Sequence, residues 1–236
     1  DALSAGVASA AAAAFGARGA EAAIKPKAPG ETKVVYLGGD QLHTGLGQRQ
    51  SLRGVFAPAK WRFLATEDAR YVTPELISDA DLLIITRWGG AIEGWSPEPI
   101  IEGAVSGDGY MSDELEQAIV DNVKNRGMGF MSLHCTIWTP DKPKFIELMG
   151  IRPIMHGPVQ TVHLHNFNQN HPITKGIADY DLALDENFGV ELVNPNAVKL
   201  YESIWAKVPA AAKFMGIAHK LSSPFMKMRK KVDIQV

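Results

Sequence analysis

The chain has 236 residues, a length typical of one large α/β domain or of one domain with extensions. Its 24 lysines and arginines against 26 aspartates and glutamates give a net charge of -2, which excludes the overall basic surface of a nucleic-acid-binding protein. Cys135 is the only cysteine, which excludes an internal disulfide, and no run of about 20 strongly apolar residues predicts a transmembrane helix.

Residues 1–32 differ in composition from the rest of the chain. Residues 1–23 contain a long alanine block without lysine, and Ala20-Glu21-Ala22 fits the A-x-A pattern of an export-signal cleavage site. Residues 24–32 form a linker rich in Pro, Gly and Lys. We expect residues 1–32 to be the remnant of a bacterial twin-arginine-like export signal and this linker, which predicts a periplasmic or exported protein. The alternative is a retained helix, because alanine is the best helix former.

Strands that alternate with helices predict the fold of residues 33–205. Four short apolar segments predict strands: Lys33–Gly38, Trp61–Thr66, Asp81–Thr86 and Met128–Leu133. Ser112 can cap a helix that ends at Gly127, and Pro143–Gly150 predicts a shorter helix. This alternation is typical of an α/β domain with a doubly wound, mostly parallel sheet. Val159–Leu164 alternates in polarity and predicts a later strand at an edge of the sheet.

Polar or reactive side chains directly follow three of the predicted strands. In chain order, these clusters are Asp40 with His43, Arg87 with Trp88, and His134 with Cys135. Ligands of open parallel sheets bind outside the carboxyl ends of the strands. We therefore expect the three clusters to converge on one site, where the first two bind the substrate.

His134 and Cys135 are the candidate catalytic residues of this site. A strand that turns sharply into a helix projects one side chain into the cleft, and a histidine there can act as a general acid or base or as a metal ligand. The alternative is a core histidine bonded to the backbone. Cys135 is either a nucleophile activated by its surroundings or a small buried hydrophobic residue, as most free cysteines are.

A histidine pair and three tryptophans offer further candidates. His163 and His165 lie two residues apart, so both point to one face of a strand and could bind Zn²⁺ or another divalent metal together with His134. The alternative is a pair of exposed polar residues. The tryptophans that flank the strand ends, Trp88, Trp95 and Trp138, either form the floor of a sugar site or pack the loops.

Several catalytic motifs are absent from the sequence. It contains no G-x-G-x-x-G, no G-x-x-x-x-G-K-[ST] and no G-x-S-x-G. These absences disfavour a dinucleotide-dependent oxidoreductase, a P-loop enzyme and a hydrolase of the serine-elbow type.

Three motifs resemble those of one known family. They are Gly127-Met-Gly-Phe-Met-Ser-Leu-His134, His171-Pro-Ile-Thr-Lys-Gly-Ile177 and Asp185-Glu-Asn-Phe-Gly-Val-Glu191. Their order and spacing resemble the ThuA ("trehalose utilisation") family over roughly Lys33 to Glu202. The resemblance implies a fold like that of class I glutamine amidotransferases, a flavodoxin-like three-layer arrangement in which His134 replaces the nucleophilic cysteine.

The resemblance also implies a function. The family is associated with trehalose and related glycosides, through 3-keto-sugar intermediates, so we expect an enzyme that acts on such carbohydrates. The motifs point to His134, Glu186 and Glu191 as catalytic residues and, less directly, to His43. The alternative is a non-catalytic carbohydrate-binding or accessory subunit, and homo-oligomerisation stays open.

Residues 206–236 depart from the family pattern. They contain seven lysines and arginines and a single acidic residue, Asp233. We interpret them as a divergent basic C-terminal segment, either solvated or in contact with an anionic membrane or partner.

Overall fold

The structure, a computed structural model, describes residues 24–40, 43–88, 111–139, 142–157 and 159–204. The expected export signal in residues 1–23, the basic segment 206–236 and Trp95 lie outside these ranges. Within them, no helix is both long and apolar enough to cross a bilayer.

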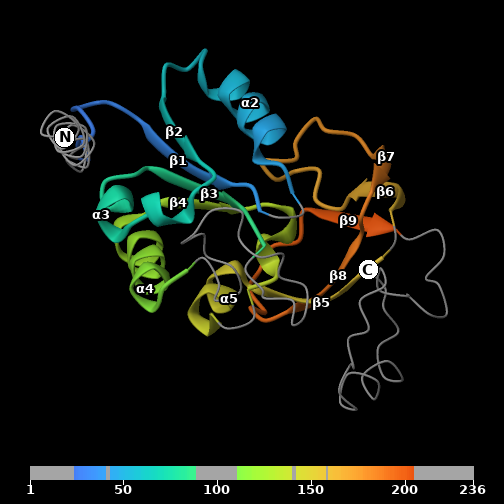
Figure 1. Ribbon diagram of the computed structural model, residues 1–236. Coiled ribbons are helices and arrows are strands. Elements are labelled where there is room, and N and C mark those ends of the chain that lie inside the picture. Colours follow the sequence, from blue (N-terminus) through green and yellow to red (C-terminus); the bar gives the residue numbers. More distant parts are fainter. Residues whose placement is uncertain (1–23, 41–42, 89–110, 140–141, 158, 205–236) are drawn as a thin grey trace, which may run out of the picture.

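A four-stranded parallel sheet forms the centre of the molecule (Figure 1). Its strand order is β2-β1-β3-β4, with bounds β1 Lys33–Gly38, β2 Arg62–Thr66, β3 Leu82–Thr86 and β4 Gly129–Ser132. All four predicted strands are confirmed, each within one residue at either end. The β-branched and apolar residues of β1 are buried along its whole length, as a central strand covered on both faces requires.

Helices cover both faces of this sheet, which gives the expected three layers (Figure 1). Helix α2, Gly45–Phe56, lies on one face, and α3, Pro74–Ile77, and α4, Asp113–Asp121, lie on the other. Alternate residues of β1 enter the two resulting cores. Val34 and Tyr36 pack with Phe56 of α2. Val35 and Leu37 pack with apolar residues of α3 and α4.

The helix before β4 begins and ends at its predicted residues. The Ser112 side chain accepts a hydrogen bond from the backbone of Leu115 and caps α4. A π-helical turn, η3 (Asn122–Arg126), continues the helix, and Gly127 ends it with a left-handed φ of 78°. The next helix, α5 (Pro143–Met149), is capped from outside because buried Glu116 of α4 accepts a hydrogen bond from the backbone of Phe145.

The start of β1 is fixed by ion pairs. The fully buried Lys33 donates from Nζ to the Asp79 carboxylate and, at 2.6 Å, to the Leu76 carbonyl. Asp81 accepts from the Lys33 backbone at 2.8 Å and from Lys27 Nζ at 2.5 Å. The second ion pair attaches the linker to the domain at the amino end of the strands.

Two small antiparallel sheets follow the parallel sheet in the chain (Figure 1). One pairs β5 (Ile151–His156) with β8 (Phe188–Leu192); the other has the order β7-β6-β9, formed by Tyr180–Asp185, Gln160–Asn166 and Tyr201–Ile204. The predicted strand near Val159–Leu164 is therefore present as β6. Its expected edge position is wrong, because β6 bonds β7 on one side and β9 on the other.

Candidate functional site

The turn after β4 places His134 at the carboxyl edge of the sheet. Leu133 is still extended, and His134 then adopts a left-handed φ of 48° and begins a single 3-10 turn, η4 (His134–Ile137). Such a conformation costs a non-glycine residue roughly 1–2 kcal/mol. A sharp strand-to-helix turn of this kind is the one that projects a side chain into the crevice of an α/β sheet.

The Thr136 hydroxyl compensates for that strain by joining β3 to η4. Its oxygen lies 2.7 Å from the carbonyl oxygen of Ile85 and 2.8 Å from that of Leu133, so it can donate to either. It also accepts a hydrogen bond from the backbone of Arg87 at 3.1 Å. This fully buried hydroxyl fixes the ends of two neighbouring strands relative to each other.

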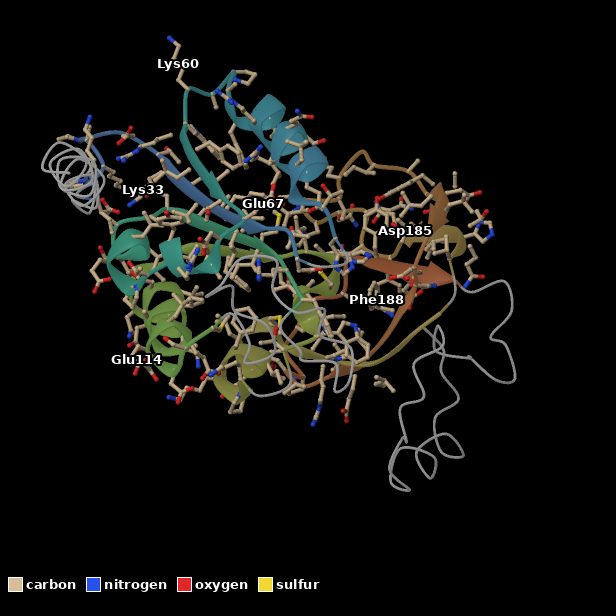
Figure 2. The ribbon with its side chains drawn as sticks, viewed as in Figure 1. Lys33, Lys60, Glu67, Glu114, Asp185 and Phe188 are labelled. Atoms are coloured by element: carbon tan, nitrogen blue, oxygen red, sulfur yellow. The ribbon has the colours of Figure 1, made fainter. Side chains whose placement is uncertain are left out.

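The His134 ring lies between an aromatic side chain and two carboxylates. Its centroid is 5.0 Å from that of Phe188, edge to face. Its Nε2 lies 3.8 Å from Asp185 Oδ1 and 4.0 Å from Glu186 Oε2. Figure 2 shows Asp185 and Phe188 at the end of the sheet opposite Lys33.

Burial keeps His134 in its neutral form. Desolvation lowers the pKa of His134, and the neighbouring His43, whose ring centroid is 5.1 Å away, lowers it further. Asp185, Glu186 and Asp40 act in the opposite direction. The imidazole is therefore a neutral base whose protonated form would be stabilised by nearby carboxylates.

Asp40 connects the three loops of the site. Its buried carboxylate accepts from the backbone amides of His43, at 2.9 Å, and Trp88, at 2.8 Å. Its two oxygens also lie 2.8 and 2.9 Å from His43 Nδ1. This hydrogen bond is the main cause of the raised pKa of His43. The sequence prediction that the three clusters converge is thus met at one carboxylate.

Cys135 lies in the same cluster as a buried thiol. Its Sγ is 3.6 Å from Asp40 Oδ2. Burial, and then the Asp40 charge, raise the pKa of Cys135 far above its usual range. The thiol therefore stays protonated at neutral pH, which favours the second of the two interpretations of Cys135, a small buried residue rather than a free nucleophile.

The remaining predicted binding residues surround this centre. Arg87 donates from Nη1 to the Gly39 carbonyl at 2.6 Å and to the Glu67 carbonyl at 3.0 Å, so it ties two strand-end loops together. Trp88 and Trp138 are half-buried. Trp138 follows η4 directly, and its backbone amide donates to the Cys135 carbonyl at 2.9 Å.

The structure does not bring His163 and His165 to His134. Both lie on β6, about half exposed, and each ring pairs with an aspartate: His163 with Asp181 at 2.7 Å and His165 with Asp179 at 2.9 Å. The predicted metal set therefore has no geometric support. Their partial exposure and their aspartate partners favour the alternative, a pair of exposed polar residues.

Glu191 lies on the face of β8 opposite Phe188. Successive side chains of a strand point to opposite faces. Phe188 faces His134, so Glu191, three residues further along β8, points to the other face and forms an ion pair with Arg152 at 3.2 Å.

Sequence reasoning missed two residues of the site, Asp185 and Phe188. Both flank the selected Glu186 in the motif Asp-Glu-Asn-Phe. Their signal was only their proximity to that glutamate, because nothing local predicts that the loop between β7 and β8 returns to η4.

Three donor atoms come close enough together to bind one metal ion. Among the described residues, the metal-ligating atoms of His43, His134 and Cys135 lie within 4.8 Å of one another. None of the described residues bonds His134 Nδ1, although this nitrogen is buried.

Comparisons with known proteins identify the family. No curated protein matches the sequence. Among solved structures, a ThuA-like protein from Bacteroides uniformis matches with a TM-score of 0.53 and 16% identity, over 76% of this chain and 70% of that one. A glutamine amidotransferase from Thermotoga maritima matches with a TM-score of 0.46 and 10% identity, over 72% of this chain and 66% of that one. A family model described as ThuA, trehalose utilisation, matches residues 34–219. The chain therefore belongs to the ThuA, or trehalose utilisation, family.

Proposed function

We propose that this chain is an enzyme of carbohydrate metabolism that acts on glycosides or 3-keto-sugars, with His134 as general base. The observation that carries the proposal is the position of His134 Nε2, 3.8 Å from Asp185 and 4.0 Å from Glu186. A general base should be neutral at rest and stabilised once it is protonated. Burial supplies the first condition for His134, and the two carboxylates supply the second.

The chemistry that suits this pair is proton abstraction beside a ketone. A ketone at C3 of a sugar acidifies the C2–H bond. His134 takes that proton, the C2–H electron pair forms a double bond to C1, and the C1–O bond breaks. The leaving oxygen receives the proton back from the protonated pair of His134 and Glu186. Water then adds across the double bond and restores the 3-keto-sugar.

Two further features support a carbohydrate substrate. Family membership associates the chain with trehalose utilisation. The half-buried Trp88 follows β3 and the half-buried Trp138 follows η4, and an indole face suits the apolar face of a sugar ring.

The test is turnover of 3-keto-trehalose by the purified full chain, measured as glucose release. His134→Gln should lower kcat by about 10²- to 10⁴-fold, the usual contribution of a general base. His165→Gln is the matched control, since it removes a histidine that also pairs with an aspartate but lies on β6. It should leave kcat within about twofold of the unchanged chain.

Two results would contradict the proposal. If 3-keto-trehalose or trehalose binds to the unchanged chain without turnover, the chain is a carbohydrate-binding or accessory subunit. If both histidine variants turn over the substrate like the unchanged chain, His134 is not the base.

We also propose that the protein is exported. The Ala-rich residues 1–23 and the cleavage pattern Ala20-Glu21-Ala22 support this localisation. Amino-terminal sequencing of the protein from its native cells should find a chain that starts after Ala22. A native chain that retains residues 1–22 would contradict cleavage at this site.

A further inference from the structure

We propose that His43, His134 and Cys135 form a metal site that binds Zn²⁺ or a cation of similar preference, with one coordination position left open. The site shares His134 with the proposed function, but its existence does not depend on which reaction the protein catalyses.

The three residues supply a set of donor atoms that suits zinc. His43 follows β1, and His134 and Cys135 follow β4, yet their ligating atoms lie within 4.8 Å of one another. Two imidazole nitrogens and one sulfur suit Zn²⁺ better than Mg²⁺ or Ca²⁺, which prefer oxygen ligands. Three protein ligands with an open fourth position are typical of catalytic rather than structural zinc sites.

The orientation of the two imidazoles leaves one nitrogen of each ring available to a metal. A histidine that binds a metal usually donates its other ring N–H to a carboxylate, which fixes the ring. Asp40 holds His43 at Nδ1, so Nε2 is the nitrogen left for a metal. For His134 the carboxylates lie on the opposite ring nitrogen: Asp185 and Glu186 are 3.8 and 4.0 Å from Nε2, too far for a direct hydrogen bond, so Nδ1 is the nitrogen left for a metal.

A buried nitrogen of His134 has no hydrogen-bond partner among the described residues. Buried polar atoms are nearly always hydrogen-bonded, and exceptions need an explanation. None of the described residues bonds His134 Nδ1, the ring nitrogen that does not face the carboxylates. A metal ion on this nitrogen would supply the missing partner.

The negative charges around the three ligands also favour a cation. The Asp40 carboxylate lies 3.6 Å from Cys135 Sγ and is itself buried. When a metal binds, the thiol proton is released to solvent and the thiolate becomes a ligand. A divalent cation would then stand among the thiolate and the carboxylates of Asp40, Asp185 and Glu186, whose negative charges it offsets.

The metal would also alter the roles of the proposed catalytic residues. With Nδ1 bound to the ion, His134 Nε2 would carry the ring proton and could not accept another. The role of base then passes from His134 to Glu186 or Asp185, so the metal-free and metal-bound forms differ in their catalytic residue.

The test is titration of the metal-stripped full chain with Co²⁺, followed by absorption spectroscopy, and competition with Zn²⁺. We expect one ion per chain and a thiolate-to-cobalt charge-transfer band in the near ultraviolet. Cys135→Ser should abolish that band, and His43→Gln should weaken binding by at least tenfold. Asp40→Asn should weaken it by about 10- to 100-fold, the usual effect of removing a carboxylate behind a metal-binding histidine.

The control is His163→Gln together with His165→Gln. These histidines offer two imidazoles on β6 but lie outside the proposed site, so their loss should leave the band and the affinity unchanged. Circular dichroism of each variant excludes unfolding as the cause of a lost band. Absence of the band in the unchanged chain at millimolar Co²⁺, or its persistence in Cys135→Ser, would overturn the proposal.

The outcome is distinguishable from failure of the proposed function. Metal binding without sugar turnover would leave the metal site standing and remove the enzyme. Equal turnover by the metal-stripped and metal-loaded chain, with no cobalt band, would exclude the metal site and leave the proposed enzyme activity standing.

Discussion

Asp40 binds His43 through both of its carboxylate oxygens, at 2.8 and 2.9 Å from Nδ1. The same carboxylate accepts from the backbone of Trp88 and lies beside the thiol of Cys135. One buried acid therefore orders the segments that follow β1, β3 and β4. Its removal should affect the stability of the site as well as its chemistry.

We expect Asp40→Asn to lower the free energy of unfolding by about 1.5–3 kcal/mol, the usual range for buried hydrogen bonds to a charged group. An amide has only one acceptor oxygen and cannot replace both carboxylate oxygens. Urea denaturation measures the change. The matched control is Asp181→Asn, which breaks the exposed pair with His163 and should cost less than about 1 kcal/mol. Equal losses in the two variants would contradict the role assigned to Asp40.

The left-handed φ of His134 predicts that glycine is a more stable replacement at this position than alanine. His134→Gly should be more stable than His134→Ala by roughly 1 kcal/mol, because glycine adopts a φ of 48° without a Cβ clash. The order should reverse on β6: His165→Gly should be less stable than His165→Ala, since glycine weakens a regular strand. Urea midpoints of the four variants test both orders, and an alanine variant more stable than glycine at 134 would exclude the strain.

Loss of the Thr136 hydroxyl should destabilise the turn that holds His134. Thr136→Val keeps the shape but removes the hydroxyl that accepts from the Arg87 backbone and lies within hydrogen-bond distance of the Ile85 and Leu133 carbonyls, so we expect a loss of about 1–3 kcal/mol. Thr136→Ser should recover most of it. Thr161→Val removes an exposed hydroxyl that bonds the Ala183 carbonyl, and this control should stay within about 0.5 kcal/mol of the unchanged chain. A small effect of Thr136→Val would mean that the strand ends are fixed by other contacts.

The ion pair at the start of β1 predicts sensitivity to acid. Burial acts to raise the pKa of Asp79, but the hydrogen bonds from Lys33 and the Lys27 backbone outweigh it and leave the pKa lowered. A carboxyl group whose folded pKa is depressed contributes stability above its unfolded pKa of about 4, and this contribution is lost as the pH falls through the folded value.

Unfolding should therefore become easier as the pH falls below about 4, and Asp79→Asn should flatten this dependence. Urea denaturation at a series of pH values from neutral to acid measures it. Thr161→Val, which removes no charge, should follow the unchanged chain at every pH. An acid limb as steep in Asp79→Asn as in the unchanged chain would assign the acid sensitivity to other groups.

Much of the fold follows from local patterns in the sequence. The central strands β1 and β3 are nearly continuous apolar runs, and capping by Ser112 and Gly127 sets the bounds of the helix before β4. The convergence of Asp40, Arg87 and His134 follows from topology alone, because all parallel strands end at one edge.

The rest of the site depends on contacts between distant segments. Nothing near Glu186 or Glu191 in the sequence shows which of them faces His134. That choice depends on the pairing of β8 with β5, which sets the faces of Phe188 and Glu191. Likewise, two histidines on one face of β6 resemble a metal pair until Asp179 and Asp181 are seen beside them.

The buried Lys33, paired with Asp79, lies at the amino end of the strands, and Asp185 and Phe188, which flank His134, lie at the opposite end, where Figure 2 shows them. Substitutions at partly exposed groups beside His134, such as Asp185 and Glu186, leave those anchors and the two apolar cores intact. A library randomised at such positions should consequently retain a high fraction of folded members. The same backbone could then be selected for new substrates by directed evolution, because residues such as Asp185 and Glu186 can change while the groups that stabilise the fold stay in place.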